Sequence, residues 1–485
     1  MISPGLRGRS RLTRPPTDGD AVRAVALLAF SLLILPPVPA AAAVIAGDST
    51  RVAAPEPRLS IDEGTAGAEP SRSEPSPTRA EGDRGAPRDT TARSAPVTTS
   101  RPPSCGLVSA GNLDGEGDDE IVCWNIGRIT IWQRAAAEWR EVYPASGGAE
   151  DAVPLGMPSR ILVADIDGDG RDDALFGFGA AKGSGSAPVE LVAVRVKGQG
   201  AARRRVTTTL YRAQPQRPEV TGLEAADLDG DGRPEILLAH FDDRYQVAVS
   251  VLSRLPGADP LGGLLPARSL GRIRMATAWA AGRLAGERSP AIAVGRAYGD
   301  ERSDPGDLFL LKGEERIHVP TQLGVHSVAI GDGDGDGTTE IYFGDGWHRE
   351  YAAKARGRLS VARRRADGSW ASELIEDTAG QYEIRKIVIG DVDGDGKPEI
   401  LTAGNIYVSL FWRSKDGWMM RRLADADDFA VARLGGQRVL VLPGRPIVLL
   451  PLKGAKSGGA PVSPPPPARE TSPSAPLSPA PAPSP

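Results

Sequence analysis

Short apolar runs recur along the chain on either side of segments rich in aspartate and glycine. Such runs precede three of these segments, at 161–164, 328–330 and 387–389, and follow three, at 174–176, 236–238 and 400–401. Two to four consecutive apolar residues bounded by turn-forming residues are typical of β-strands. We therefore expect each polar segment to connect the two strands of a β-hairpin.

Four of the polar segments share a nine-residue pattern with carboxylates at positions 1, 3, 5 and 9 and glycine at position 6. Alternating carboxylates, together with the main-chain carbonyl of position 7, supply the oxygen shell that Ca²⁺ prefers, and the glycine allows a sharp turn. Position 12 is apolar or threonine, so the bidentate glutamate of an EF-hand is missing. The expected ligands are Asp165, Asp167, Asp169, Arg171 and Asp173; Asp227, Asp229, Asp231, Arg233 and Glu235; Asp332, Asp334, Asp336, Thr338 and Glu340; and Asp391, Asp393, Asp395, Lys397 and Glu399.

Three weaker copies extend the series to seven. The first keeps oxygen ligands at all four positions, whereas the copies starting at Arg283 and Arg433 have lost the acids; the ligands expected in the first are Asn112, Asp114, Glu116 and Glu120. A hairpin cannot cover its own apolar face, and a repeat of roughly 40–60 residues with four short strands is the mark of a propeller blade. The sequence therefore predicts an all-β fold, a seven-bladed β-propeller, with six or eight blades as the alternatives.

The repeated run D-x-D-G-D-G-x-x-[DE]-[IL]-[LV], followed by glycine, resembles the FG-GAP/VCBS repeats of integrin α-subunit propellers and of many secreted bacterial proteins. The resemblance covers nearly all of residues 105–452. It implies a calcium-stabilised propeller used for binding, with an enzyme as an occasional exception. We expect four to five Ca²⁺ ions with a structural role, because without metal each loop crowds like charges.

The last repeat leaves the closure of the ring open. Its strands are expected at about 428–434, 437–442 and 446–452, after which a proline-rich segment begins. Either this blade stays three-stranded, or residues before Cys105, such as 97–99, pair there, since an exposed strand edge invites aggregation.

Composition divides the chain into four parts. An arginine-rich start, an apolar run at 24–35 and small residues after it predict an export signal over residues 1–46, with an uncleaved membrane anchor as the alternative. Residues 47–104 carry few large aliphatics and no aromatic residue, which predicts a disordered linker. Residues 105–452 form the propeller, and the proline-rich residues 453–485 a disordered tail.

Overall composition excludes several classes of protein. The 58 glycines and 43 prolines argue against long helices, and a net charge of −4 gives no case for nucleic acid. Two cysteines exclude a disulfide-dense scaffold. They flank the first loop, and export favours a disulfide between them. Simple hairpin pairing places Cys123 nearer Ser109 than Cys105, so a bridge requires Cys105 to leave the strand; two reduced cysteines are the alternative.

The connections that follow the second strand of three neighbouring blades are rich in aromatic and charged residues. They are expected at the face opposite the acidic loops, where aromatic rings can stack on sugars or anchor a protein. The alternative is that the aromatic residues pack between blades. The candidates for this ligand face are His240, Arg244, Tyr245, Arg296, Tyr298, Trp347, His348 and Tyr351.

These features favour a secreted or periplasmic calcium-binding propeller that binds an extracellular glycan or protein. We expect a monomer without nucleic acid and without a membrane span in the mature chain. One alternative is an extracellular polysaccharide-active enzyme of the lyase or dehydratase type, in which His240 with Arg244, or His348 with Arg349 and Tyr351, would serve proton abstraction beside a carboxylate. Another is a structural envelope protein. Four histidines and no recognisable catalytic motif lead us to expect no enzyme.

Overall fold

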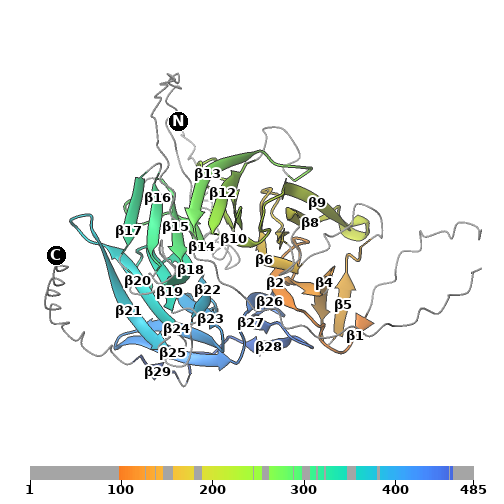
Figure 1. The fold of residues 1–485 in the computed structure, drawn as a ribbon. Coiled ribbons are helices and arrows are strands. Elements are labelled where there is room, and N and C mark those ends of the chain that lie inside the picture. Colours follow the sequence, from red (N-terminus) through yellow and green to blue (C-terminus); the bar gives the residue numbers. More distant parts are fainter. Residues whose placement is uncertain are drawn as a thin grey trace, which may run out of the picture. The chain divides into compact units, whose positions relative to one another are not determined.

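The computed structural model describes the central part of the chain. Its described residues are 98–462 except 126, 137, 146–156, 180–187, 244, 254–260, 288, 298–305, 313–314, 320, 322–323, 347–356, 379–382 and 458. They form seven antiparallel sheets and one 3₁₀ helix, Gly200–Ala202. No helix among them has the length and apolar character needed to cross a membrane. The sheets are the blades of a seven-bladed β-propeller (Figure 1), which confirms the fold class expected from the repeats.

The first strand of each blade lies nearest the middle of the ring (Figure 1), and the first strands of neighbouring blades contact one another from blade 7 through blade 1 to blade 6. These strands are β2 (Leu107–Gly111), β6 (Met157–Ala164), β10 (Val220–Ala226), β14 (Ala276–Gly282), β18 (Gly324–Gly331), β22 (Ile384–Gly390) and β26 (Ala430–Leu434). The second strands are β3 (Glu120–Asn125), β7 (Asp173–Gly179), β11 (Glu235–Phe241), β15 (Ala291–Arg296), β19 (Glu340–Gly346), β23 (Glu399–Gly404) and β27 (Gln437–Leu442).

Outer strands complete the blades. The third strands are β4 (Arg128–Ala135), β8 (Val189–Lys197), β12 (Gln246–Leu252), β16 (Leu308–Lys312), β20 (Gly357–Arg364), β24 (Val408–Ser414) and β28 (Val448–Pro451). The fourth are β5 (Glu138–Val142), β9 (Arg204–Ala213), β13 (Ala267–Arg274), β17 (Glu315–Val319), β21 (Trp370–Thr378) and β25 (Gly417–Ala424). Buried apolar clusters join neighbouring blades, so the core is continuous from blade to blade.

A small residue recurs where the second strand of a blade meets the first strand of the next. It lies opposite a β-bulge in the first strand of five blades, and the residues are Gly177, Ala239, Gly295, Gly344 and Ala403. A Cβ at Gly344 would lie 2.6 Å from the Cβ of Ile384 in the next blade, and one at Gly295 would lie 2.9 Å from the Cβ of Val325. Close packing between blades therefore accounts for a glycine or alanine at each of these five positions.

The ring closes between blade 7 and blade 1. The main chains of Cys105 and Gly444 exchange two hydrogen bonds of 2.9 and 3.0 Å, and the amide of Ile447 donates to the carbonyl of Pro103. Blade 7 has three strands in the described residues. The strand β1 (Thr98–Thr99) pairs with β5 of blade 1, so the suggested pairing of residues 97–99 with the last blade is wrong. A single buried cluster shared by the two blades covers the seam instead.

The propeller extends about ten residues beyond the boundary expected at 452. The strand β29 (Ala460–Pro461) adds a fifth strand to blade 6 by pairing with β25. Leu452 and Ala455 are buried, and they hold the intervening segment against the core of blades 6 and 7. The signal predicted at 1–46, residues 47–97 of the predicted linker and residues 463–485 of the tail lie outside the described residues.

Cys105 and Cys123 form a disulfide, with their Cα atoms 5.1 Å apart. Cys123 pairs in register with Val108, one residue from the position expected, and Cys105 lies outside β2. The bridge therefore forms as the sequence required, with Cys105 outside the strand. Because Cys105 also pairs with Gly444, the disulfide ties the seam of the ring to the second strand of blade 1.

Glu224 on β10 makes the stability of the fold depend on pH. Burial raises its pKa from 4.5 to about 8, although the nearby Arg160 guanidinium lowers it in part. Between about pH 4.5 and 8 the folded state therefore keeps a proton that the unfolded chain has already released. The free energy of unfolding falls as the pH rises through this window. We expect Glu224→Gln, which mimics the protonated acid, to raise the free energy of unfolding at pH 9 by about 1–2 kcal/mol.

The measurement for Glu224 is urea unfolding of wild type and variant between about pH 4 and 9. The two stabilities should be closest at about pH 4, because Glu224 is then protonated in the folded state and largely protonated in the unfolded chain. A difference in the free energy of unfolding that stays the same at every pH would show that the pKa of Glu224 does not change on folding.

Candidate functional site

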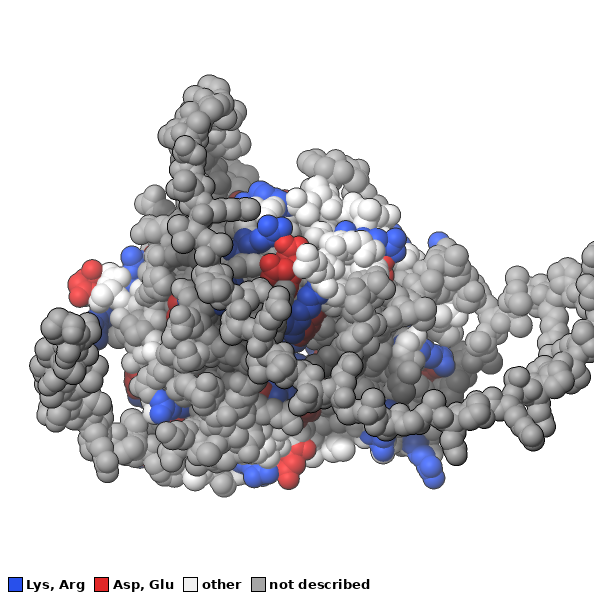
Figure 2. Space-filling model, in the orientation of Figure 1, with Lys and Arg blue, Asp and Glu red and all other residues white. Residues whose placement is uncertain are grey.

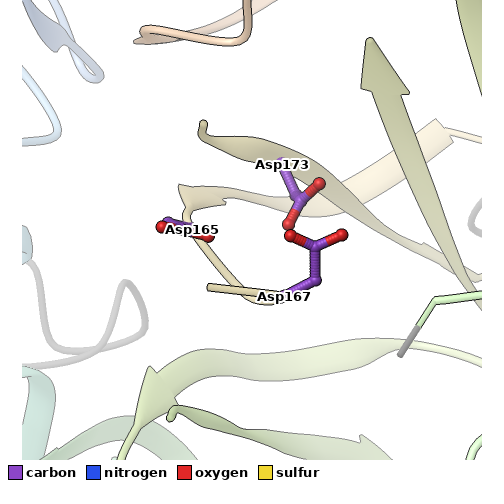
Figure 3. Close-up of side chains that lie close together, drawn as sticks. All are labelled: Asp165, Asp167 and Asp173. Carbon is purple, nitrogen blue, oxygen red and sulfur yellow. The ribbon is translucent and has the colours of Figure 1, made fainter. Parts of the chain in front are cut away.

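The acidic loops connect the first and second strands of their blades, as the hairpin pattern predicted. Equivalent loops of neighbouring blades are hydrogen-bonded: the amide of Asp172 donates to the carbonyl of Asn112, and that of Ala285 to the carbonyl of Thr339. The loops therefore share one face of the propeller. In the second blade, Asp165 follows β6, Asp173 begins β7, and the carboxylates of Asp167 and Asp173 point toward each other (Figure 3).

The aspartate at position 1 organises each complete loop. Asp227 Oδ1 accepts a hydrogen bond from the amide of Gly230 at 2.7 Å, and Oδ2 accepts one from Gly232 at 3.0 Å. The same pair of bonds occurs at Asp165, Asp332 and Asp391. Gly230 and Gly232 have φ of 86° and 83°, a region that side chains disfavour, so the two glycines let the backbone amides turn inward.

The acid at position 9 closes the loop from the buried side. Glu235 Oε2 accepts a 2.7 Å hydrogen bond from the amide of Leu228, and Asp173 accepts one from Ile166. Burial, with the neighbouring Asp167 adding, raises the pKa of Asp173 to about 8; burial likewise raises that of Glu235 to about 7. Burial therefore disfavours the ionised form of these two acids in the absence of a bound cation.

Four loops bring three carboxylates to within 4.8 Å of one another. The groups are Asp165, Asp167 and Asp173; Asp227, Asp229 and Asp231; Asp332, Asp334 and Asp336; and Asp391, Asp393 and Glu399. Converging carboxylate oxygens suit a hard divalent cation, so these four clusters could hold metal ions. The other predicted acids of these loops, Asp169, Asp395, Glu235 and Glu340, belong to the same loops but not to these tight groups.

The residue at position 7 of each loop takes part in the loop's hydrogen bonds through its main-chain amide. The amides of Arg171, Arg233, Thr338 and Lys397 donate to the position 5 carboxylate of their own loops at 2.7–2.9 Å. These bonds set the turn of each loop. The role of the four carbonyls as ligands stays a prediction.

The loop of blade 1 has Asn112 and Glu116 where the four complete loops have aspartate, and a guanidinium lies in it. Arg203 Nη1 is 3.0 Å from Asp114 Oδ2, and Arg203 also pairs with Glu116. The hydroxyl of Tyr143 donates to Asp114 at 2.8 Å. Asn112 and Glu120 are buried beside this pair, and the loop does not form a tight acidic group among the described residues. Its residues therefore fit an internal cation better than a metal ion.

Basic side chains also reach three of the four acidic clusters. Lys456 Nζ lies 2.7 Å from Asp395 and 2.6 Å from Glu399. Arg363 contacts Asp334 and Glu340 at 2.8 and 2.9 Å, and Arg195 contacts Asp167 at 3.4 Å. The cluster at Asp227 has no such ion pair within the described residues, so it is the most open of the four.

The predicted ligand face is described only in part. His240 is 3% exposed; its Nδ1 lies 3.1 Å from the carbonyl of Phe241, and its Nε2 lies 3.1 Å from the hydroxyl of Tyr211. Tyr245 is 40% exposed with Arg274 over its ring, and Arg296 pairs with Asp307. Burial lowers the pKa of His240, which keeps the imidazole neutral. The other candidates, Arg244, Tyr298, Trp347, His348 and Tyr351, lie outside the described residues.

A cavity of about 440 Å³ opens between blades 2 and 3. Its lining includes Tyr211 and Pro215 from blade 2, and His240, Asp242, Ser269 and Arg272 from blade 3. β11 begins beside an acidic loop and ends at Phe241, so His240 and Asp242 place the cavity toward the opposite face. The sequence pointed to His240 but not to Tyr211 or Arg272, because nothing in the repeat pattern shows which outer strands meet across two blades.

Comparisons with known proteins add a distant structural likeness. No protein-family model matches the chain, and no curated protein matches it. One similar solved structure, from work on specific recognition of non-reducing terminal N-acetylglucosamine, is a lectin of Agrocybe aegerita; the alignment covers 67% of this chain and 81% of the lectin. The sequence identity is 15% and the TM-score 0.41. A likeness this distant carries no argument about function.

Proposed function

We propose that the protein is an exported, calcium-stabilised β-propeller of the FG-GAP/VCBS type that serves as a binding module for an extracellular glycan or protein. The observation that carries this proposal is that the two faces of the propeller hold different kinds of site. One face holds four clusters of converging carboxylates, and the other end of blades 2 and 3 holds a polar cavity.

Calcium is the ion that suits the acidic clusters best. Their donors are carboxylate oxygens without histidine or cysteine, which favours a hard cation over zinc or copper. Burial and the neighbouring Asp167 raise the pKa of Asp173, and Ca²⁺ bound at this cluster would favour the ionised carboxylate. The ions have a structural role in this proposal, because the loops connect strands and are hydrogen-bonded from blade to blade.

Export and a non-catalytic role complete the proposal. A disulfide such as Cys105–Cys123 persists in oxidising compartments, which supports a location outside the cytoplasm. His240, the histidine nearest the cavity, shares its two ring nitrogens with Tyr211 and Phe241 and has a lowered pKa. A buried histidine engaged in this way suits structure and recognition better than proton abstraction.

The test is a binding screen of the full chain against immobilised oligosaccharides in millimolar Ca²⁺ and after chelation, with folding followed by circular dichroism. We expect saturable binding by the calcium-loaded chain. Turnover of a polysaccharide by the same sample would favour the enzyme alternative. Absence of binding and turnover by a folded, loaded chain would point to a protein partner or to a structural role.

A further inference from the structure

We propose that the cavity between blades 2 and 3 binds a single neutral pyranose unit of a glycan. This inference rests on the proposed function and names the site and the class of ligand. The cavity's volume of about 440 Å³ exceeds that of one sugar ring, and it is open to solvent on one side, so a terminal unit can enter while the rest of the glycan stays outside.

The sequence of blade 3 produces the hollow. His240, Ala248 and Arg272 lie side by side in register on β11, β12 and β13, so their side chains share one face of the sheet. The residue between the two long side chains is alanine. Gly271 precedes Arg272 beside a β-bulge and has φ of 107°, and a Cβ there would meet nothing within 4 Å. Small residues at these places leave space that larger side chains would fill.

Blade 2 supplies the opposite wall and an aromatic ring. Tyr211 lies on β9, and the segment after that strand is fixed to blade 3 by a 3.0 Å hydrogen bond from the amide of Gln216 to the carbonyl of Asp242. The Tyr211 ring is tilted by 44° to the His240 ring, with centroids 5.9 Å apart. An aromatic ring beside polar groups is the usual arrangement for contact with the C–H face of a sugar.

The polar groups at the cavity match hydroxyls rather than a charged ligand. Asp242 and Arg272 form an ion pair of 2.5 Å in which Asp242 is 30% and Arg272 66% exposed, so both reach solvent. A carboxylate accepts two hydrogen bonds from neighbouring hydroxyls, and a guanidinium donates to a hydroxyl or ring oxygen. His240 is neutral and buried, so it adds no charge. With the two charges balanced, neither an anion nor a cation gains a net attraction.

The experiment measures binding of the full chain to immobilised oligosaccharides and to soluble methyl pyranosides in Ca²⁺. Two variants change the cavity: Ala248→Leu fills its floor, and Asp242→Asn removes the acceptor charge. We expect each to weaken the binding of the best sugar at least tenfold. The matched control is Asp425→Asn, which breaks the exposed Arg422–Asp425 ion pair in blade 6 and should leave binding unchanged.

The outcomes separate the cavity from the wider proposal. Loss of binding in Asp242→Asn, with an unchanged melting temperature, supports the site even if Ala248→Leu folds poorly. Equal binding by wild type and both variants overturns the cavity while glycan binding stands. No binding of any sugar by the folded wild type overturns the cavity and the glycan form of the proposed function. A melting temperature that still rises with Ca²⁺ would leave the metal assignment intact.

Discussion

Millimolar Ca²⁺ is expected to raise the free energy of unfolding of the full chain by about 5–6 kcal/mol. At a tenfold excess over Kd, each site contributes about 1.4 kcal/mol, and four acidic clusters are available. Extracellular calcium modules bind at about 10⁻⁴–10⁻³ M, so this tenfold excess is reached at about 1–10 mM Ca²⁺. The melting temperature should rise by about 10 °C. Differential scanning calorimetry with Ca²⁺, with Mg²⁺ and with a chelator measures the effect.

The Asp227→Asn variant isolates one cluster, the one that no described basic side chain reaches. It should lose about a quarter of the calcium-dependent stabilisation, because Asp227 anchors the loop through Gly230 and Gly232. Glu287→Gln removes the single carboxylate at the ligand positions of the blade 4 loop; it is the matched control and should keep the full calcium effect. A wild-type melting temperature that does not change when Ca²⁺ is added would contradict the metal assignment.

Gly344→Val is expected to destabilise the fold by about 3–5 kcal/mol. A Cβ at this position would lie 2.4 Å from Ser327 Oγ and 2.6 Å from the Cβ of Ile384, which is fully buried. Moving the Cβ of Ile384 would shift its strand, and moving Ser327 Oγ would break its 2.8 Å hydrogen bond to the carbonyl of Ile384. Urea unfolding of wild type and variant in Ca²⁺ measures the loss.

Gly263→Val is the matched control for this variant. A Cβ at Gly263 would have no neighbour within 4 Å, and its φ lies outside the region that favours glycine. The control should stay within about 0.5 kcal/mol of wild type. Equal stability of Gly344→Val and Gly263→Val would show that blades can separate at this position without cost.

Local chemistry allowed much of the architecture to be predicted. The acidic loops can be recognised in the sequence because all their acids lie within nine consecutive residues. The apolar runs beside them mark the first two strands of the blades. Seven copies therefore gave seven blades, and the last blade's strands begin and end within about two residues of the expected positions.

Contacts between distant residues could not be predicted. Arg203 enters the loop at Asp114 from a segment 89 residues away in another blade, and Lys456 reaches Glu399 from beyond the last blade. A single basic residue in the sequence gives no indication of which acid it will contact. The cavity likewise depends on which outer strands meet across blades. The strand β29 was not predicted because it pairs through only two residues, Ala460 and Pro461. Such features follow from tertiary packing rather than from periodicity.

The seam of the ring has a mechanical consequence. Main-chain bonds and a shared apolar cluster join blade 1 to blade 7, and the described chain leaves the propeller by way of two short edge strands, β1 and β29. Tension applied through the two ends would peel these two-residue pairings first. On the N-terminal side the load would then fall on the Cys105–Gly444 pair, where the disulfide passes it into β3 of blade 1. The covalent bond thus stops unravelling from the N-terminal side at Cys105.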